Sequence, residues 1–152
     1  MQSTKQAIFL LGEEEYSFDI MDIKTLEKVI PIQEVENLTK NFKGTINLRG
    51  DIIPVYSLRR KFGLEDIPTD QDTRFIITTS NGFLVAYEVD KTKEIVQLEE
   101  NQVYDAPALL KSKDSSYVKA VSKVEERLVI ILDSDNLLTE NEVVEIKAIL
   151  NH

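Results

Sequence analysis

The sequence predicts a mainly β fold built from small barrels, and two observations support this prediction. Roughly nine or ten short stretches alternate apolar with polar residues, whereas few stretches have a helical period and there is no tandem repeat. Asn81 and Gly82 separate two such stretches, residues 74–80 and 83–89, and an Asn-Gly pair supplies the positive φ angles of a tight hairpin turn. Many short strands joined by sharp turns are typical of small β barrels.

Length and composition indicate one domain, or two small subdomains that share a core. The 152 residues are 42% apolar and 30% charged, which is ordinary for a globular protein. We therefore treat residues 1–152 as one domain. The polar run 64–73, which contains Pro68, places a junction between two intertwined subdomains near residues 63–73.

The charge and the missing residue types exclude several functions. A net charge of -9 disfavours nucleic acid as a partner, because a polyanion would be repelled. The absence of cysteine fits a cytoplasmic location, and the one histidine, His152, is the last residue, so catalysis by an imidazole is not expected. The apolar run 7–11 is too short to span a membrane, so we expect no insertion into a bilayer.

The first forty residues predict three strands and a loop. Residues 6–11 and 16–20 form a hairpin, and residues 25–30 are predicted as a third strand, although their apolar positions also fit a helical turn. Residues 33–43 are polar, with apolar residues at helix-compatible intervals. We interpret them as a packed loop rather than as a marginal helix.

Residues 44–63, GTINLRGDIIPVYSLRRKFG, form the most informative stretch, because they combine two strands, a turn and a short helix. An alternating strand leads to a turn at Gly50 and Asp51, and residues 52–55 carry the chain back. Proline cannot donate a hydrogen bond to a neighbouring strand. Pro54 therefore predicts that this second strand lies at a sheet edge or contains a bulge.

The second half of the chain predicts further strands and one long connection. Residues 94–98, 117–124 and 128–132 have strand patterns, and the last two form a hairpin across a charged turn. Residues 101–116 form a connection of a length that is often functional. Within it, residues 106–110 are expected to pack on the barrel.

Two helices are expected. Ser57 is a suitable N-cap for a one-turn helix that ends before Gly63. Residues 133–138 begin a helical tail, in which Thr139 and Glu142 have the spacing of a capping box. The apolar face that docks this tail on the sheet consists of Val143, Ile146 and Leu150.

Acidic clusters in the sequence do not indicate a metal site. Asp133 and Asp135 resemble the start of a calcium loop, but Leu138 stands where such a loop needs glycine, and Val144 stands where it needs a ligand. The two aspartates are instead expected to lie near a helix N-terminus, where negative charge is favoured. The acidic run 13–15 is interpreted as a solvated loop.

The basic residues allow two interpretations. Arg59, Arg60 and Lys61 form the one dense basic cluster, which in an acidic protein predicts a solvated helix face or salt bridges to acidic loops rather than a phosphate site. Arg49 ends a strand beside a glycine, which lets another backbone approach closely. Its simplest role is an internal salt bridge.

Residues 46–62, INLRGDIIPVYSLRRKF, resemble the signature of the CheW-like bacterial chemotaxis coupling proteins, whose hallmark is the Asn-Leu-Arg-Gly block. The similarity extends through YSFDI at 16–20, the hairpin around residues 81–82 and RLVIILDSDNLL at 127–138. It therefore covers nearly all of the chain.

The resemblance implies two five-stranded SH3-like β barrels packed side by side on a shared hydrophobic core. It also implies a protein without catalytic activity, cofactor or metal. Such an adaptor couples the cytoplasmic tip of methyl-accepting chemoreceptors, a helical bundle, to the regulatory domain of the chemotaxis histidine kinase. It is cytoplasmic and is recruited to membrane-associated receptor arrays. Two alternatives stay open: a paralogous coupling protein of another array and, less favoured, a ligand-binding β-barrel module.

The receptor-binding groove that this resemblance implies falls on Ile23, Thr25, Leu26, Gly44, Asn47, Leu48 and Arg49. Arg49 is expected to matter most, by forming hydrogen bonds that fix the register of a receptor helix. The resemblance assigns no residue of this chain to the kinase interface.

Two departures from the family pattern affect this site. Some relatives carry a glutamate where Thr25 stands, which is able to pair with the signature arginine. Here Arg49 needs another partner, for which Glu27 and Glu36 are candidates, or it stays available to the receptor. The segment before the first signature strand keeps only Pro31, whereas many relatives have a second proline.

Overall fold

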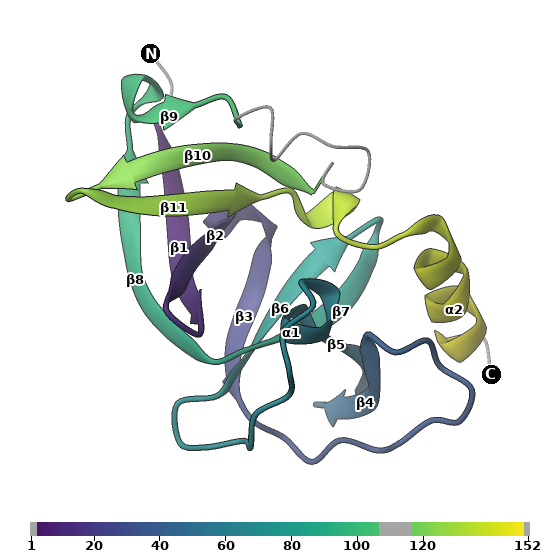
Figure 1. Ribbon diagram of the computed structural model, residues 1–152. Coiled ribbons are helices and arrows are strands. Elements are labelled where there is room, and N and C mark those ends of the chain that lie inside the picture. Colours follow the sequence, from purple (N-terminus) through teal and green to yellow (C-terminus); the bar gives the residue numbers. More distant parts are fainter. Residues whose placement is uncertain (1–2, 107–116, 151–152) are drawn as a thin grey trace.

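The computed structural model describes residues 3–106 and 117–150, which form two β sheets with helices beside them (Figure 1). The larger sheet has six strands in the order β8-β1-β2-β11-β10-β9, and the smaller has five in the order β3-β6-β7-β5-β4. The strands of the larger sheet are β1 (Thr4–Leu11), β2 (Glu14–Asp19), β8 (Lys91–Leu98), β9 (Val103–Tyr104), β10 (Val118–Val124) and β11 (Arg127–Leu132). Those of the smaller sheet are β3 (Ile23–Lys28), β4 (Phe42–Leu48), β5 (Asp51–Ser57), β6 (Arg74–Ser80) and β7 (Phe83–Val89).

Each sheet curves until strands that are distant in the sheet order meet. In the larger sheet, Arg127 of β11 lies 2.8 Å from Glu94 of β8, although β1 and β2 separate these strands. In the smaller sheet, Arg49, which follows β4, lies 3.8 Å from Glu27 of β3, and these two strands are opposite edges. Such contacts require a barrel-like closure. The predicted mainly β fold with two small barrels is therefore confirmed, except that the larger sheet has a sixth strand, the two-residue β9.

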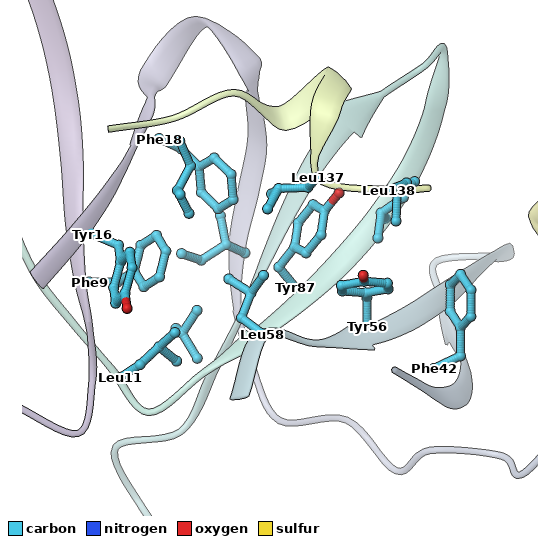
Figure 2. Close-up of a cluster of buried hydrophobic side chains, with 14 of the residues drawn as sticks. Phe9, Leu11, Tyr16, Phe18, Phe42, Tyr56, Leu58, Tyr87, Leu137 and Leu138 are labelled. Carbon is cyan, nitrogen blue, oxygen red and sulfur yellow. The ribbon is translucent and has the colours of Figure 1, made fainter. Parts of the chain in front are cut away.

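A shared core joins the two barrels, as the resemblance implied. Its centre is a continuous row of five aromatic rings, which Figure 2 shows together with the aliphatic side chains around them. Neighbouring ring centroids are 5.2 to 5.5 Å apart along Phe9, Phe18, Tyr87, Tyr56 and Phe42. The first two rings come from the six-stranded sheet and the other three from the five-stranded sheet. Close-packed aromatic rings stabilise a fold by more than the apolar area that they bury would give. This row of rings is therefore an important packing contact between the two barrels.

Both predicted helices are present, with the predicted caps. In α1 (Leu58–Lys61), the Ser57 hydroxyl accepts a hydrogen bond from the backbone N–H of Arg60 at 3.2 Å. Before α2 (Glu140–Leu150), the Thr139 hydroxyl accepts from the N–H of Glu142 at 3.1 Å, and the Glu142 carboxylate accepts from the N–H of Thr139 at 2.9 Å. This reciprocal pair is the capping box.

The docking face of α2 differs in part from the prediction. Ile146 is fully buried and Val143 packs against the shared core, as expected. Leu150 is exposed, so its predicted docking is wrong. Instead the face contains Glu142, a carboxylate that is only 4% exposed. An apolar stripe alone did not reveal this polar contact, because the partners of Glu142 lie far away in the sequence.

Strand β5 lies inside its sheet, between β7 and β4, so the edge position predicted from Pro54 is wrong. The pairing with β7 begins only at Val55, one residue after the proline. The other predicted possibility, a bulge at the proline, is not observed either, because Pro54 pairs in regular register with Thr45. The irregularity between β4 and β5 lies on β4, between Phe42 and Gly44.

The chain passes between the two sheets at a short 3₁₀ helix, η1 (Ile20–Asp22), and again at Asp90, between β7 and β8. Residues 63–73, where a junction was expected, instead connect α1 to β6 and so stay with the five-stranded sheet. That run therefore does not mark a crossing between the barrels. The treatment of the chain as one domain stays a prediction.

The predicted loop and long connection are only partly irregular. Residues 33–41 are a loop, except that Gln33 pairs with Thr45 in an isolated β bridge. The connection after β8 contains a 3₁₀ helix, η2 (Glu100–Gln102), then the short strand β9 and buried Ala106. The predictions on residues 107–116 lie outside the described residues.

Candidate functional site

The signature residues form the tip of the β4–β5 hairpin, and the turn is one residue earlier than predicted. Leu48 pairs with Asp51, so Arg49 and Gly50 are the two turn residues, with φ of 51° and 92°, and Asp51 already belongs to β5. A two-residue hairpin turn of this type needs positive φ at both positions. The Asn47 side chain supports the turn, because its Oδ1 accepts a hydrogen bond from the N–H of Gly50 at 3.0 Å.

Arg49 projects from this turn, and its side chain is 74% exposed. Its guanidinium lies 3.8 Å from the Glu27 carboxylate, so Glu27 is the partner rather than Glu36. The other oxygen of Glu27 accepts a hydrogen bond of 2.6 Å from the Thr25 hydroxyl. Thr25 thus orients the carboxylate that faces Arg49. At 3.8 Å and high exposure this pair is weak, so the guanidinium is able to exchange Glu27 for another acceptor.

The other predicted site residues on β3 lie on two faces of the strand. Thr25 is opposite Ile77 and Leu26 is opposite Ile76, and neighbouring residues of a strand point to opposite faces. Leu26 is 44% exposed, which is unusual for a large apolar side chain. Ile23 is half-buried and packs against the shared core. Leu26 is therefore more accessible than the other apolar residue that the resemblance implies on β3.

On β4, the predicted residues again divide into exposed and structural ones. Asn47 is exposed, whereas Leu48 packs against the core of the five-stranded barrel. Gly44 is buried, and a Cβ there would lie 2.2 Å from the backbone oxygen of Gln33. Gly44 is also five residues from Arg49, or roughly 16 Å along a strand. Its observed contact is with the Gln33 backbone rather than with the exposed hairpin tip.

One exposed residue at the hairpin was not among the predicted site residues. Ile52 pairs with Asn47 across the hairpin, so the two side chains share a face, and Ile52 is 48% exposed. Ile52 also borders a cleft of about 490 Å³ between residues 33–38 and α2, together with Val35 and Ile149. The alternation of Ile46 with Leu48 indicated which residues of β4 face inward. Asn47, between these two residues, therefore faces outward, and residues opposite each other in an antiparallel pair point to the same face. Ile52, which is opposite Asn47, could have been predicted to face outward as well.

The two arginines of the basic cluster after β5 form salt bridges. Salt bridges were one of the two predicted roles of this cluster, the other being a solvated helix face. Both Arg59 and Arg60 pair with carboxylates, at 2.7 Å to Asp90 and at 2.8 Å to Asp66. The hydrogen bonds that the two guanidinium groups donate to these carboxylates raise the pKa of both arginines. Lys61 lies over the ring of Tyr117, 5.3 Å from its centroid. The cluster thus stabilises the fold around α1.

The aspartates that resemble a calcium loop have the helix-end role predicted for them. Asp133 caps the 3₁₀ helix η5 (Ser134–Asn136) by accepting from the N–H of Asp135 at 3.0 Å. Asp135 accepts from the N–H of Asn81 at 2.9 Å, which ties this helix to the β6–β7 hairpin. Among residues 3–106 and 117–150 no group of acidic or histidine side chains is arranged to hold a metal ion. No helix in these ranges is long and apolar enough to cross a membrane.

Two barrels on a shared core, with an arginine-tipped hairpin at the rim of one barrel, define a two-barrel β protein with an exposed hairpin as its candidate binding site. The sequence model of the CheW-like domain matches residues 6–142, and the chain therefore belongs to the CheW-like family. This membership confirms the prediction of a non-catalytic adaptor in bacterial chemotaxis, and the alternative of a ligand-binding module is not favoured.

Individual relatives show the same likeness over almost the full length. The chain is 29% identical over 136 residues to the chemotaxis protein CheW of Klebsiella aerogenes, covering 90% of this chain and 82% of the relative. It is 27% identical over 134 residues to the CheW of Bacillus subtilis, covering 88% and 86%. Among solved structures, the scaffolding protein TtCheW of Thermoanaerobacter tengcongensis superposes with a TM-score of 0.85 at 30% identity, covering 93% of this chain and 96% of that one.

Proposed function

We propose that this protein couples the cytoplasmic tip of chemoreceptors to the regulatory domain of a chemotaxis histidine kinase, with the β4–β5 hairpin on the receptor side. The observation that carries the proposal is the 74% exposure of the Arg49 side chain on a two-residue turn, where its ion pair to Glu27 is weak. An exposed arginine with a weak ion pair is able to donate hydrogen bonds to a new acceptor, which suits binding to a helix surface. The adaptor then acts in the cytoplasm, at membrane-associated receptor arrays.

The proposed receptor surface has an apolar part beside the arginine. Ile52 on β5 and Leu26 on β3 are both exposed, at 48% and 44%; Ile52 lies opposite Asn47 in the hairpin, and Leu26 precedes Glu27 in the chain. An amphipathic receptor helix would cover these side chains and present an acceptor to the guanidinium. Asn47 shapes the turn, while Ile23, Thr25, Gly44 and Leu48 hold the strands that display it. The kinase domain would bind elsewhere, barrel against barrel.

Calorimetric titration tests this proposal directly. A receptor-tip fragment and the kinase regulatory domain from the same organism are each titrated with wild type and with Arg49→Glu. Lys123→Glu is the matched control, because it makes the same charge change at a side chain that is 64% exposed on β10. We expect Arg49→Glu to weaken receptor binding by about tenfold or more, which is the loss of one interface anchor, and to leave kinase binding unchanged.

Two results would contradict the proposal. Wild type that binds neither partner would remove the coupling function. Equal receptor affinity of wild type and Arg49→Glu would show that the hairpin tip is not part of the receptor interface. Receptor tips from each signalling array of the organism, titrated in parallel, would identify the array that the protein serves.

A further inference from the structure

The segment that leads into β4, residues 39–41, is held by the C-terminal helix. The Glu145 carboxylate of α2 accepts two hydrogen bonds from Thr39, at 2.8 Å from the backbone N–H and at 2.5 Å from the hydroxyl. Glu142, one turn earlier on α2, accepts from the side-chain amide of Asn41 at 3.0 Å. Hydrogen bonds to a charged carboxylate are stronger than those between neutral groups. Figure 1 shows α2 beside the loop that enters β4.

The same three-residue segment is also held by the end of β5 and by α1. Arg60 donates from its guanidinium to the backbone oxygen of Lys40 at 2.8 Å. The N–H of Ser57 donates to the backbone oxygen of Asn41, also at 2.8 Å. Thr39, Lys40 and Asn41 are therefore each fixed by a partner that is distant in the sequence.

The buried carboxylate of Glu142 fixes α2 itself. Besides Asn41, it accepts from the Tyr56 hydroxyl and from the N–H of Thr139, both at 2.9 Å. Three donors satisfy a carboxylate that would be costly to bury alone. Ile146 adds an apolar contact to the shared core on the same helix. Glu142 and Ile146 thus anchor α2 on the barrel, and Glu145 of the same helix accepts the two hydrogen bonds from Thr39.

This attachment matters because β4 is an edge strand. It has one neighbour, β5, apart from the isolated bridge between Gln33 and Thr45. An edge strand has fewer hydrogen bonds to break before it opens locally, so its stability depends on what fixes its ends. One end of β4 is the hairpin turn, and the other is the segment that α2 holds.

We propose that α2 is a positioning element for the β4–β5 hairpin, and that Glu145 is the residue that transmits its position to β4 through Thr39. Without this contact, residues 39–48 open locally more often, while the other strands of the two barrels stay paired. The consequence for receptor binding rests on the proposed function of the hairpin. The contact itself does not.

Hydrogen exchange measured by mass spectrometry tests the contact. Glu145→Ala removes both acceptors for Thr39, and alanine has the higher helix propensity, so faster exchange cannot come from a weaker helix. Glu140→Ala is the matched control, because Glu140 is exposed at the start of the same helix. We expect Glu145→Ala to increase exchange in residues 39–48 by at least about threefold, which corresponds to the loss of one modest hydrogen bond, with β6 and β7 unchanged. Unchanged exchange in residues 39–48, or an equal increase in all strands, would overturn the proposal.

Titration of the same two variants with the receptor-tip fragment tests the positioning role. Glu145→Ala is expected to bind the receptor tip several-fold more weakly, whereas Glu140→Ala binds like wild type. Faster exchange with unchanged receptor affinity would overturn positioning. If wild type does not bind the receptor tip, the proposed function fails, and the exchange result still decides whether α2 holds β4.

Discussion

Arg59 and Asp90 form a two-pronged ion pair at the junction of the two barrels. The Nε and Nη2 atoms of Arg59 donate to the two carboxylate oxygens of Asp90 at 2.8 and 2.7 Å. The N–H of Gly12, in the β1–β2 turn, donates to the same carboxylate at 2.7 Å. Asp90 lies where the chain passes from β7 to β8, so the pair connects α1, this crossing and the first hairpin. The two side chains are only 17% and 16% exposed.

Replacing Asp90 with asparagine should destabilise the protein substantially. The change leaves the partly buried Arg59 charge without its counter-ion, and such losses lower the free energy of unfolding by about 2 to 3 kcal/mol. Urea denaturation measures this. Asp66→Asn is the control, because Asp66 pairs with Arg60 at a carboxylate that is 49% exposed, where about 0.5 kcal/mol is expected. Equal effects of the two changes would contradict the special role of Asp90.

The same ion pair should make stability depend on acid pH. Burial by itself would raise the pKa of Asp90, but hydrogen bonds from Arg59 and from the Gly12 N–H outweigh it and lower the pKa below its usual value. In the unfolded chain the pKa of an aspartate is about 3.9. A pKa that is lower in the folded state gives stabilisation that is complete above the unfolded pKa and is lost as pH falls through the folded pKa.

The difference in unfolding free energy between wild type and Asp90→Asn should therefore stay constant from about pH 7 to pH 5 and shrink below about pH 4. Denaturation curves of the two proteins at a series of pH values measure this difference. A difference that stays constant down to the lowest pH at which both proteins fold would show that Asp90 is not stabilised as a carboxylate.

Local chemistry made several elements predictable from the sequence. Asn81 and Gly82 form the β6–β7 turn, with φ of 54° and 82°, because few other residue pairs tolerate these angles. Ser57 and the pair of Thr139 with Glu142 cap the two helices as predicted. In each case the interacting residues are at most three positions apart, so their spacing in the sequence fixes their geometry.

What the sequence did not reveal depends on distant contacts. The place of β5 inside its sheet results from its parallel pairing with β7, thirty-one residues later at Val55 and Ala86. The burial of Glu142 results from Tyr56 and Asn41. For the candidate site, the resemblance indicated the residues but not that Gly44 is buried. The Arg49–Glu27 pair was one of two candidates until the barrel closure brought β3 and β4 together.

The conformation of Arg49 leads to a prediction about the hairpin turn. Its φ of 51° is strained for an ordinary residue by about 1 kcal/mol and unstrained for glycine. Arg49→Ala should stay within about 0.5 kcal/mol of wild type, since the exposed ion pair contributes little. Arg49→Gly should be more stable than Arg49→Ala by about 0.5 to 1 kcal/mol. Thermal unfolding compares the two variants, and a less stable Arg49→Gly would show that the turn residue does not have a positive φ.

Gly44 has a structural role that the substitution Gly44→Ala, which adds one methyl group, should reveal. A Cβ on Gly44 would lie 2.2 Å from the backbone oxygen of Gln33, and φ at Gly44 is 141°. Gln33 cannot retreat freely, because it exchanges two backbone hydrogen bonds with Thr45, at 2.8 and 2.9 Å. Gly44→Ala should therefore lower the free energy of unfolding by about 3 kcal/mol or more, from backbone strain and steric overlap together.

Gly50→Ala separates the two causes, since Gly50 also has a positive φ of 92° but has open space around it. It should cost only about 1 kcal/mol, which is the strain of the backbone without overlap. Urea denaturation of both variants gives the comparison, with a circular dichroism spectrum to confirm that each one folds. Equal losses at the two glycines would show that the Gln33 backbone does not press against Gly44.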